Sequence, residues 1–351
     1  MWVKNCWYVV AWDHEVLGDT LLTRTLLGVP LLIYRRADGT PVALDNRCPH
    51  RQAPLSMGRR EGDHIRCLYH GLRFEPGGRC VEIPGQSQVP PKMCTRAYPV
   101  VEQGRWLWVW MGDAELADPA KIPFTPTLKH PDWRYRPGYM HYQADYLLIC
   151  DNLLDFSHLS YVHEKTLGGS PNIAEVRPTV ERLNDGRVEG LAVTRHVNGT
   201  VPAPYHQRLG KFNGPVNRRF AYEFLLPGIL LLHAHVKPAS NAEDDMTGAL
   251  QFDSCQALTP ETEHTTHYFY MQAHGFRQDD ATITEAIYQS LCAAFEEDRR
   301  MIEAQQAQLL AAPGLEMQGI VADQALVQFR RLVAQRVKAE SNGENKSEPR
   351  P

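Results

Sequence analysis

Four side chains of metal-binding type fall into two short segments of the sequence. The first segment is Cys48-Pro49-His50, and the second is Cys67-Leu68-Tyr69-His70. Each segment supplies one thiolate and one imidazole, and the nearby Pro54 and Gly71 favour tight loops around them. Two such loops could close over one small metal centre from opposite sides.

The same four ligand types would also suit a structural zinc ion, so the spacing has to separate the two possibilities. Zinc fingers usually place their two cysteines close together and their two histidines close together, whereas here each loop carries one of each. Mixed loops suit a [2Fe-2S] cluster in which both cysteines hold one iron and both histidines hold the other. The pattern therefore favours the cluster, with zinc as the alternative.

A second group of polar residues lies in the apolar segment 142–162. Asp155 precedes His158 by three residues, so the two would share one face of a helix. His163 lies five residues beyond His158, which requires a kink or a helix end near Ser160. Buried imidazoles and carboxylates are costly unless they bind something, yet a histidine on a helix is commonly an ordinary core or surface residue. Taken alone, this segment is only a candidate metal site.

Size and charge limit the class of protein. The chain has 351 residues, 43% of them hydrophobic and 22% charged, which is typical of about two globular domains. Its net charge of -4 offers no basic field for a phosphate backbone, so we expect no nucleic-acid partner. The apolar stretch 21–34 is interrupted by Arg24, Gly28 and Pro30 and is too short to cross a membrane.

Cysteine usage bears on the compartment. The chain contains 8 cysteines, and its N-terminus shows no basic segment followed by an apolar one, as a secretory signal would. Paired thiols in such a chain indicate metal binding more often than disulfides. We therefore expect a cytoplasmic protein.

The order of apolar runs and turn signals predicts two domains and a tail. Short apolar runs separated by turns, ending in the aromatic run 105–110, predict an all-β domain over residues 1–115. After a connector at 115–130, helical and strand-like patterns predict an α+β domain over residues 116–340, with a long helix from Ala281 to Leu310. Residues 341–351 are polar and poor in apolar side chains, which predicts a disordered tail.

The segment from Cys48 to Gly71 resembles the Rieske motif of ring-hydroxylating and O-demethylating oxygenases. The resemblance implies a Rieske [2Fe-2S] cluster on Cys48, His50, Cys67 and His70, which would take electrons from a reductase or ferredoxin partner. Two positions differ from many members of the family. Gln52 stands where they have glycine, and Leu72, which stands where they have tryptophan, is similar to the vanillate demethylase branch.

Beside such a motif, the segment 152–163 is similar to the family's Asn-x-x-Asp-x-x-His-x(4)-His pattern. The resemblance implies that His158 and His163 bind one ferrous iron and leave positions open for dioxygen. The third ligand would be Asp298, with Glu297 as the fallback.

The resemblance also gives roles to the remaining polar residues of this segment. Asp155 would bridge His70 of a neighbouring subunit and the iron-ligand histidine, in a ring of three chains. Asn152 would lie near the iron without binding it.

Within this superfamily the chain most resembles the vanillate and dicamba demethylases. This implies an α+β catalytic domain of the helix-grip (START-like) type with an antiparallel sheet and flanking helices. It also implies a monooxygenase that removes the methyl group of a methoxylated aromatic acid. Gln256, His233 and Arg219 lie on expected strands and could orient that substrate. A hydroxylase or dihydroxylase on the same scaffold is the alternative, and a Rieske electron carrier is a third.

Overall fold

The computed structural model describes residues 2–168 and 172–347, which form two compact units. The N-terminal unit consists of residues 2–119 together with 259–263, and the C-terminal unit contains the rest. Each unit has its own sheets and is described separately. None of the described helices has an apolar stretch long enough to cross a membrane.

Three small antiparallel sheets build the N-terminal unit. Tyr8 and Trp108 are fully buried, and the aromatic run that ends the predicted all-β domain forms strand β11, in which every residue is buried. The sheets have the strand orders β1-β11-β10, β2-β3-β4-β9 and β5-β6-β7-β8. Their strands are β1 (Trp7–Trp12), β2 (Leu22–Leu26), β3 (Val29–Arg35), β4 (Pro41–Asp45), β5 (Arg59–Glu61), β6 (His64–Arg66), β7 (Arg73–Phe74), β8 (Cys80–Glu82), β9 (Ala97–Tyr98), β10 (Val100–Gln103) and β11 (Trp106–Trp110).

Two loops of this unit carry the Cys-His segments. One loop follows strand β4, and the other connects β6 to β7. Beneath them lies a core that includes Cys48 and Cys67 themselves, packed with Leu32, Leu44 and Phe74. The loops are therefore fixed to a packed base.

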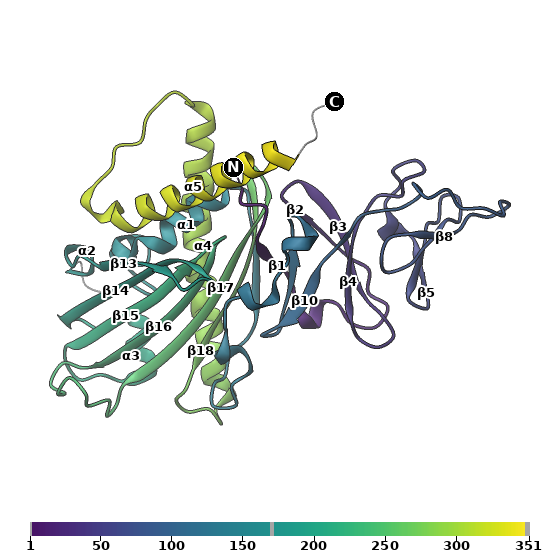
Figure 1. Ribbon diagram of the computed structural model, residues 1–351. Helices are drawn as coiled ribbons and strands as arrows, with labels where there is room; N and C mark the ends of the chain where they lie inside the picture. The colour runs from purple at the N-terminus through teal and green to yellow at the C-terminus, as the bar shows by residue number, and fades with distance from the viewer. Residues whose placement is uncertain (1, 169–171, 348–351) are drawn as a thin grey trace. The chain divides into compact units, whose positions relative to one another are not determined.

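A seven-stranded antiparallel sheet forms the centre of the C-terminal unit. Figure 1 shows its long strands β14 to β18 side by side. Its strand order is β12-β18-β17-β16-β15-β14-β13. Successive residues of a strand point to opposite faces of the sheet, so every second residue contributes to the same face. The strands are β12 (Gly138–Tyr142), β13 (Thr179–Asn184), β14 (Glu189–Thr200), β15 (Val216–Leu225), β16 (Ile229–Pro238), β17 (Leu250–Thr262) and β18 (Thr265–His274).

Helices pack against this sheet. Helix α4 (Ala281–Ala311) contacts strands β12 and β18, while α5 (Gln324–Ser347) contacts β14. Helix α1 (Tyr146–Leu154) contacts both of these helices. The short helices α2 (Asn172–Glu175) and α3 (Pro204–Gly210) also belong to this unit, as do the 3-10 turns η5 (Pro126–Lys129), η6 (Phe156–Ser160) and η7 (Val321–Asp323). The 3-10 turns η1 (Asp13–Glu15), η2 (Leu55–Met57) and η3 (Ala114–Leu116) belong to the N-terminal unit, and η4 (Pro119–Lys121) includes the boundary between the two units in the sequence.

Two expectations about helices need correction. The segment predicted as one helix up to about Ser160 breaks earlier, because Asp155 adopts an extended conformation and caps the 3-10 turn η6. Helix α5 continues to Ser347, so residues 341–347 of the predicted disordered tail are helical, and 348–351 lie outside the described residues. A polar composition does not by itself prevent a helix that is already nucleated from extending.

Candidate functional site: two metal centres

The two Cys-His loops have the same backbone hydrogen bonds. In the first loop, Cys48 N–H donates to the Ala53 carbonyl and Gln52 N–H donates to the Cys48 carbonyl, both at 2.8 Å. In the second loop, Cys67 N–H donates to Leu72 at 2.8 Å and Gly71 N–H donates to Cys67 at 3.0 Å. Each loop is thus one tight turn closed on its own cysteine.

These matched turns also share an unusual backbone conformation. The fourth residue after each cysteine has a positive φ, 59° at Gln52 and 74° at Gly71. The turn therefore requires the left-handed conformation at both positions, which glycine adopts without strain. Gln52 adopts it at some cost and leaves the turn intact.

Within these loops the thiols are buried and the imidazoles are exposed. Cys48 and Cys67 are 2% and 1% exposed and their thiols contact each other, while the rings of His50 and His70 meet with centroids 4.4 Å apart. Burial raises the pKa of Cys48 to about 11, and the backbone N–H groups of His50 and Arg51 act in the opposite direction. One sulfur pair lies inside and one nitrogen pair lies outside.

The spacing of these donors bears on the choice between zinc and a cluster. Tetrahedral zinc would bring all four ligand atoms within about 4 Å of one another. In the described part of the chain, the ligand atoms of the two Cys-His loops do not form a compact group of three or more donors within 4.8 Å of one another. Such a group is found in the C-terminal unit instead. A separated sulfur pair and nitrogen pair fit a centre with two irons.

The compact donor group is His158, His163 and Asp298, whose ligand atoms all lie within 4.8 Å of one another. His158 lies in η6, His163 follows in the next turn, and Asp298 comes from the buried face of α4. Oδ1 of Asp298 is 3.1 Å from His163 Nε2 and 3.5 Å from His158 Nε2. Two imidazoles and one carboxylate on one side form the donor set of a non-haem ferrous site, and these residues fit that metal.

Neighbouring groups orient each of these three side chains. The Asp155 carbonyl contacts His158 Nδ1, which directs Nε2 toward Asp298. Asn152 Nδ2 donates to Asp298 Oδ1 at 3.0 Å, so Asn152 lies beside the donor group.

Glu297, the fallback ligand, has a different position. Its Oε2 lies 2.8 Å from His163 Nδ1, the ring nitrogen that faces away from Asp298, and accepts a hydrogen bond of 2.7 Å from Thr166. Glu297 therefore supports a ligand, while Asp298 belongs to the donor group.

Burial and charge act differently on the two imidazoles. Burial lowers the pKa of His158, which favours the neutral ring that a metal requires. Burial also acts to lower the pKa of His163, but the carboxylates of Asp298 and Glu297 outweigh it and raise that pKa. The pKa of each imidazole therefore depends on the balance between burial, which lowers it, and neighbouring carboxylates, which raise it.

Asp155 makes its own contacts within the chain. Its carboxylate accepts hydrogen bonds from Ser157 N at 2.8 Å and from Ser157 Oγ at 2.6 Å, and a guanidinium nitrogen of Arg195 lies 3.9 Å away. It thereby caps η6, the turn that carries His158. Within one chain, the backbone of Asp155 rather than its carboxylate contacts the histidine.

A cavity of about 100 Å³ opens beside the donor group. Most of its lining is apolar and comes from Leu153, Phe156, Leu159, Leu167, Phe220, Leu232, Ala234, Phe252, Leu291 and Phe295. The polar residues of the lining outside the donor group are Asn152, Tyr205, His206, Arg218, Ser254, Gln256 and Gln272. An apolar wall with a few polar groups is typical of a site for a small organic molecule.

Of the three predicted substrate-orienting residues, the structure places only Gln256 in this cavity. There its amide accepts from Tyr268 and donates to Ser254 at 3.0 Å. Arg219 and His233 do not line the cavity, although their strand neighbours Arg218 and Ala234 do. Successive residues of a strand face opposite sides, which explains why Arg219 and His233 lie outside this cavity.

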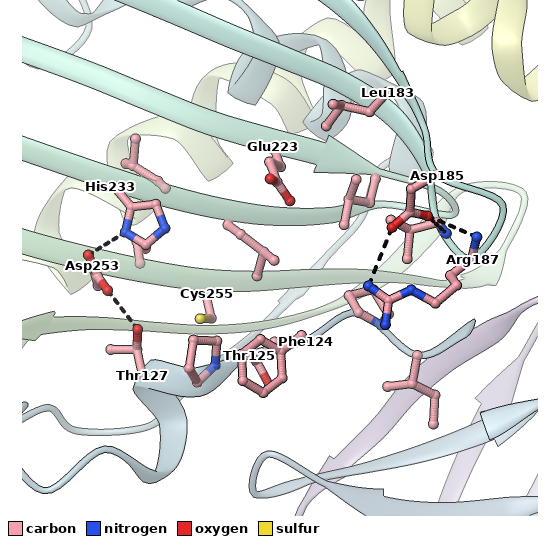
Figure 2. A pocket seen from close by; sticks show the side chains of 18 of the residues that line it. Phe124, Thr125, Thr127, Leu183, Asp185, Arg187, Glu223, His233, Asp253 and Cys255 are labelled. Carbon is pink, nitrogen blue, oxygen red and sulfur yellow. Dashed lines mark hydrogen bonds and ion pairs between the residues drawn. The ribbon is translucent and has the colours of Figure 1, made fainter. Parts of the chain in front are cut away.

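His233 instead lines a second hollow, of about 550 Å³, which Figure 2 shows. There His233 Nδ1 lies 2.7 Å from Asp253 Oδ1, and Thr127 donates to the other oxygen of that carboxylate at 2.6 Å. Figure 2 shows Phe124 and Thr125 of the connector on one side of the hollow and Glu223 of β15 on the other. None of the three metal-site residues lines it.

Sequence reasoning missed Arg218 and His206, both of which line the cavity beside the metal site. Strand alternation could have shown that Arg218 shares a face with Phe220 and Tyr222, two buried aromatic residues. No comparable signal marks His206, which lies on the short helix α3.

Two family models match the chain in the same places as the two centres. The Rieske [2Fe-2S] domain matches residues 6–99, and the vanillate O-demethylase oxygenase C-terminal domain matches residues 142–339. The chain belongs to the Rieske non-haem iron oxygenases. It is the oxygenase component of a Rieske monooxygenase, with a [2Fe-2S] cluster in the N-terminal unit and a mononuclear iron in the C-terminal unit.

The similarity to individual Rieske oxygenases extends over almost the whole chain. The toluene-4-sulfonate monooxygenase iron-sulfur subunit of Comamonas testosteroni is 46% identical over 98% of this chain and 99% of its own. The dicamba O-demethylase oxygenase component of Stenotrophomonas maltophilia is 33% identical over 94% and 96%. The crystal structure of dicamba monooxygenase bound to dicamba superposes with a TM-score of 0.88 at 30% identity, covering 97% of this chain and 99% of that one. The fold class predicted from the resemblance is confirmed.

Proposed function

We propose that this Rieske oxygenase removes the methyl group of a methoxylated aromatic acid, using dioxygen and electrons from an NAD(P)H-dependent reductase. The observation that carries the proposal is the mainly apolar cavity beside His158, His163 and Asp298. The overall reaction takes the aryl methyl ether, dioxygen, NAD(P)H and a proton. It gives the phenol, formaldehyde, water and NAD(P)⁺.

In this mechanism the metal groups supply electron storage and dioxygen activation, and the protein supplies position. The apolar wall holds an aromatic ring and keeps bulk water away from the donor group. Gln256 provides an amide whose orientation is fixed by Tyr268 and Ser254. Asn152 and Glu297 hold Asp298 and His163 in the orientation that ligation requires.

Electron delivery is the proposed role of Asp155. We place His50 and His70 at the surface that meets the electron donor or a neighbouring subunit, because both imidazoles are exposed. Asp155 would connect His70 of one subunit to His158 of the next in a homotrimer, while its hydrogen bonds to Ser157 fix its position. We also infer a cytoplasmic location from the cysteine content discussed above.

A second candidate reaction is hydroxylation of an alkyl side chain on an aromatic acid. The 46% identity to the toluene-4-sulfonate monooxygenase subunit favours it, because the substrate that gives that relative its name carries a methyl group and no methoxy group. Both reactions oxidise a carbon held beside the same iron. They differ only in whether that carbon leaves as formaldehyde.

Product analysis separates the two candidates. The purified oxygenase is supplied with a generic reductase, NADH and either methoxybenzoates or methylbenzoates. Formaldehyde from a methoxybenzoate supports O-demethylation, whereas a benzylic alcohol from a methylbenzoate with no formaldehyde from any methoxy compound supports the second reaction. NADH consumption without either product would reject both.

A further inference from the structure

Arg218 is a buried cation that has no acidic partner within residues 2–168 and 172–347. Its side chain is 3% exposed, and no carboxylate among the described residues lies within ion-pair distance of it. It donates to the carbonyls of Gly168 at 2.6 Å and Leu167 at 3.2 Å, and its Nε has no hydrogen-bond partner in the described part of the chain. Burial lowers the pKa of Arg218 to about 10, so the guanidinium remains charged at neutral pH. A buried charge paired only with carbonyl dipoles is costly to maintain.

His206 lies beside this cation and is also incompletely satisfied. Its side chain is buried, and its Nδ1 has no hydrogen-bond partner among residues 2–168 and 172–347. Burial, and then the positive charge of Arg218, lower the pKa of His206 well below its usual value. The ring is therefore neutral, and it can donate one hydrogen bond without adding a second charge.

Both side chains line the cavity that the donor group opens into. Arg218 lies on β15 two residues before Phe220, whose ring it covers at 5.0 Å, and His206 lies on α3. Phe252 and Leu167 add apolar wall to this cavity, and Tyr205, next to His206, accepts a hydrogen bond of 2.9 Å from Gln272. In a weakly solvated cavity an anion would find one full positive charge and one neutral hydrogen-bond donor on the same side.

We propose that Arg218 and His206 form an anion subsite that binds the carboxylate or sulfonate of the aromatic substrate and so directs its reactive carbon toward the iron. This inference rests on the proposed function for the identity of the reaction, but the subsite itself concerns binding. Its ligand class is a small aromatic molecule with one negative group. The subsite makes Arg218 a specificity-determining residue.

A structural role for Arg218 predicts a different result. Its two carbonyl partners belong to the turn after His163, in which Gly168 N–H donates to the His163 carbonyl at 2.8 Å. If the guanidinium only held this turn, its removal would weaken iron retention and would weaken the binding of every ligand by the same factor. If Arg218 belongs to an anion subsite, its removal would weaken the binding of negatively charged ligands and leave the binding of neutral ligands unchanged.

Equilibrium binding to the oxidised holoprotein without reductant tests the proposal, since no turnover occurs. The probes are 3-methoxybenzoate, 3-methoxybenzenesulfonate and the neutral 3-methoxybenzamide, measured by calorimetry. We expect the protein to bind at least one of the two anions about 10- to 100-fold more tightly than the amide, as a charge-assisted hydrogen bond would give. The arm with the stronger preference identifies carboxylate or sulfonate as the natural group. Equal binding of the amide and both anions would overturn the proposal without any variant.

Variants then assign the preference to residues. Arg218→Gln should reduce the preference for the anion to about twofold or less, and Arg218→Lys should keep part of it. Arg219→Gln is the matched control, because it removes the same charge from the adjacent position on the opposite face of β15. If Arg218→Gln weakens the binding of the anion and of the amide by the same factor, the role of Arg218 is structural and the proposal fails.

The outcome for the subsite is separate from the outcome for the reaction. Arg218-dependent anion binding with no formaldehyde would keep the subsite and reject O-demethylation. Formaldehyde formation with no preference for anions would do the reverse. Should Arg218→Gln fail to fold, His206→Phe provides the second test, with an expected loss of anion preference smaller than that of Arg218→Gln.

Discussion

Nε2 of His163 lies 3.1 Å from Oδ1 of Asp298, and the opposite ring nitrogen lies 2.8 Å from Glu297. Two adjacent residues of α4 therefore contact two different atoms of one imidazole. The carboxylate of Asp298 is placed to bind the metal, and the carboxylate of Glu297 is placed to orient the imidazole of His163. It also permits the two roles to be tested separately.

We predict that Asp298→Ala abolishes iron binding at the mononuclear site and leaves the cluster in place. The variant removes one of three ligands, whereas the cluster depends on residues of the other unit. Turnover should fall below detection, and the visible absorption of the cluster should be unchanged. A bleached cluster spectrum would contradict the separation of the two centres.

Glu297→Gln should have a milder effect than Asp298→Ala. An amide still reaches His163 but cannot offer the negative charge that strengthens the ligand, which typically costs about 10- to 100-fold in metal affinity. Iron retention against a competing chelator measures this. Glu296→Gln is the control, since Glu296 pairs with Arg299 on the helix surface and does not contact the metal site. Equal iron retention in both variants would exclude the supporting role of Glu297.

Asp155→Asn should retain both metals and slow electron transfer between them. Asparagine caps a helical turn about as well as aspartate, so η6 should remain folded. The lost charge would weaken the proposed bridge to His70 of the neighbouring subunit. Single-turnover kinetics provide the measurement, with Ser157→Ala as a control that removes only a partner of the carboxylate. An unchanged rate of product formation would refute the bridge.

A pH dependence is expected at the ion pair of Asp151 with Arg330, whose Nε lies 2.9 Å from the carboxylate. Burial raises the pKa of Asp151 above its ordinary value, and Arg330 acts against that rise. Arg330→Ala should reduce the free energy of unfolding by about 1–3 kcal/mol at neutral pH, because it leaves a buried carboxylate without a partner.

The sign of the pH effect follows from the raised pKa. A protonated Asp151 needs no cation, so the deficit of the Arg330→Ala variant should shrink as the pH falls toward the ordinary aspartate range and grow as the pH rises. Denaturant unfolding at several pH values between about 4.5 and 8 measures it. A deficit independent of pH would show that packing, and not charge, explains the loss.

The Rieske loops provide a test of backbone strain. Gln52→Gly should stabilise the N-terminal unit by up to about 1 kcal/mol, since φ of 59° is unfavourable for a residue with a Cβ atom. Gly71→Ala should destabilise it, because the added Cβ would also lie 2.8 Å from Pro84 Cγ. Thermal unfolding of the holoprotein compares the two variants. Destabilisation by Gln52→Gly would contradict the strain.

The cluster ligands could be predicted because all four lie in two short segments with characteristic spacing. The third ligand of the mononuclear site could not be fixed by local spacing, since Asp298 comes from a distant helix. A signal was present, however. The buried stripe of α4 runs through Ile287, Leu291, Phe295 and Ile302, and Asp298 interrupts it with a charged side chain.

The substrate cavity was harder to predict, because it depends on strand register. Neighbouring residues of a strand face opposite sides of the sheet, so Arg218 and Ala234 line the cavity while Arg219 and His233 do not. For Arg218 a signal was present, because its alternation with Phe220 and Tyr222 in β15 places it on the buried face. His206 depends on the packing of a short helix, which no periodicity in the sequence indicates.

Metal analysis of the purified chain beside its His158→Ala variant tests the central claim most directly. Two irons in the cluster and one at His158, His163 and Asp298 should give three irons and two acid-labile sulfides per chain. The variant should keep two irons and both sulfides. Zinc without labile sulfide in the unmodified chain, or loss of sulfide from the variant, would contradict two separate iron centres.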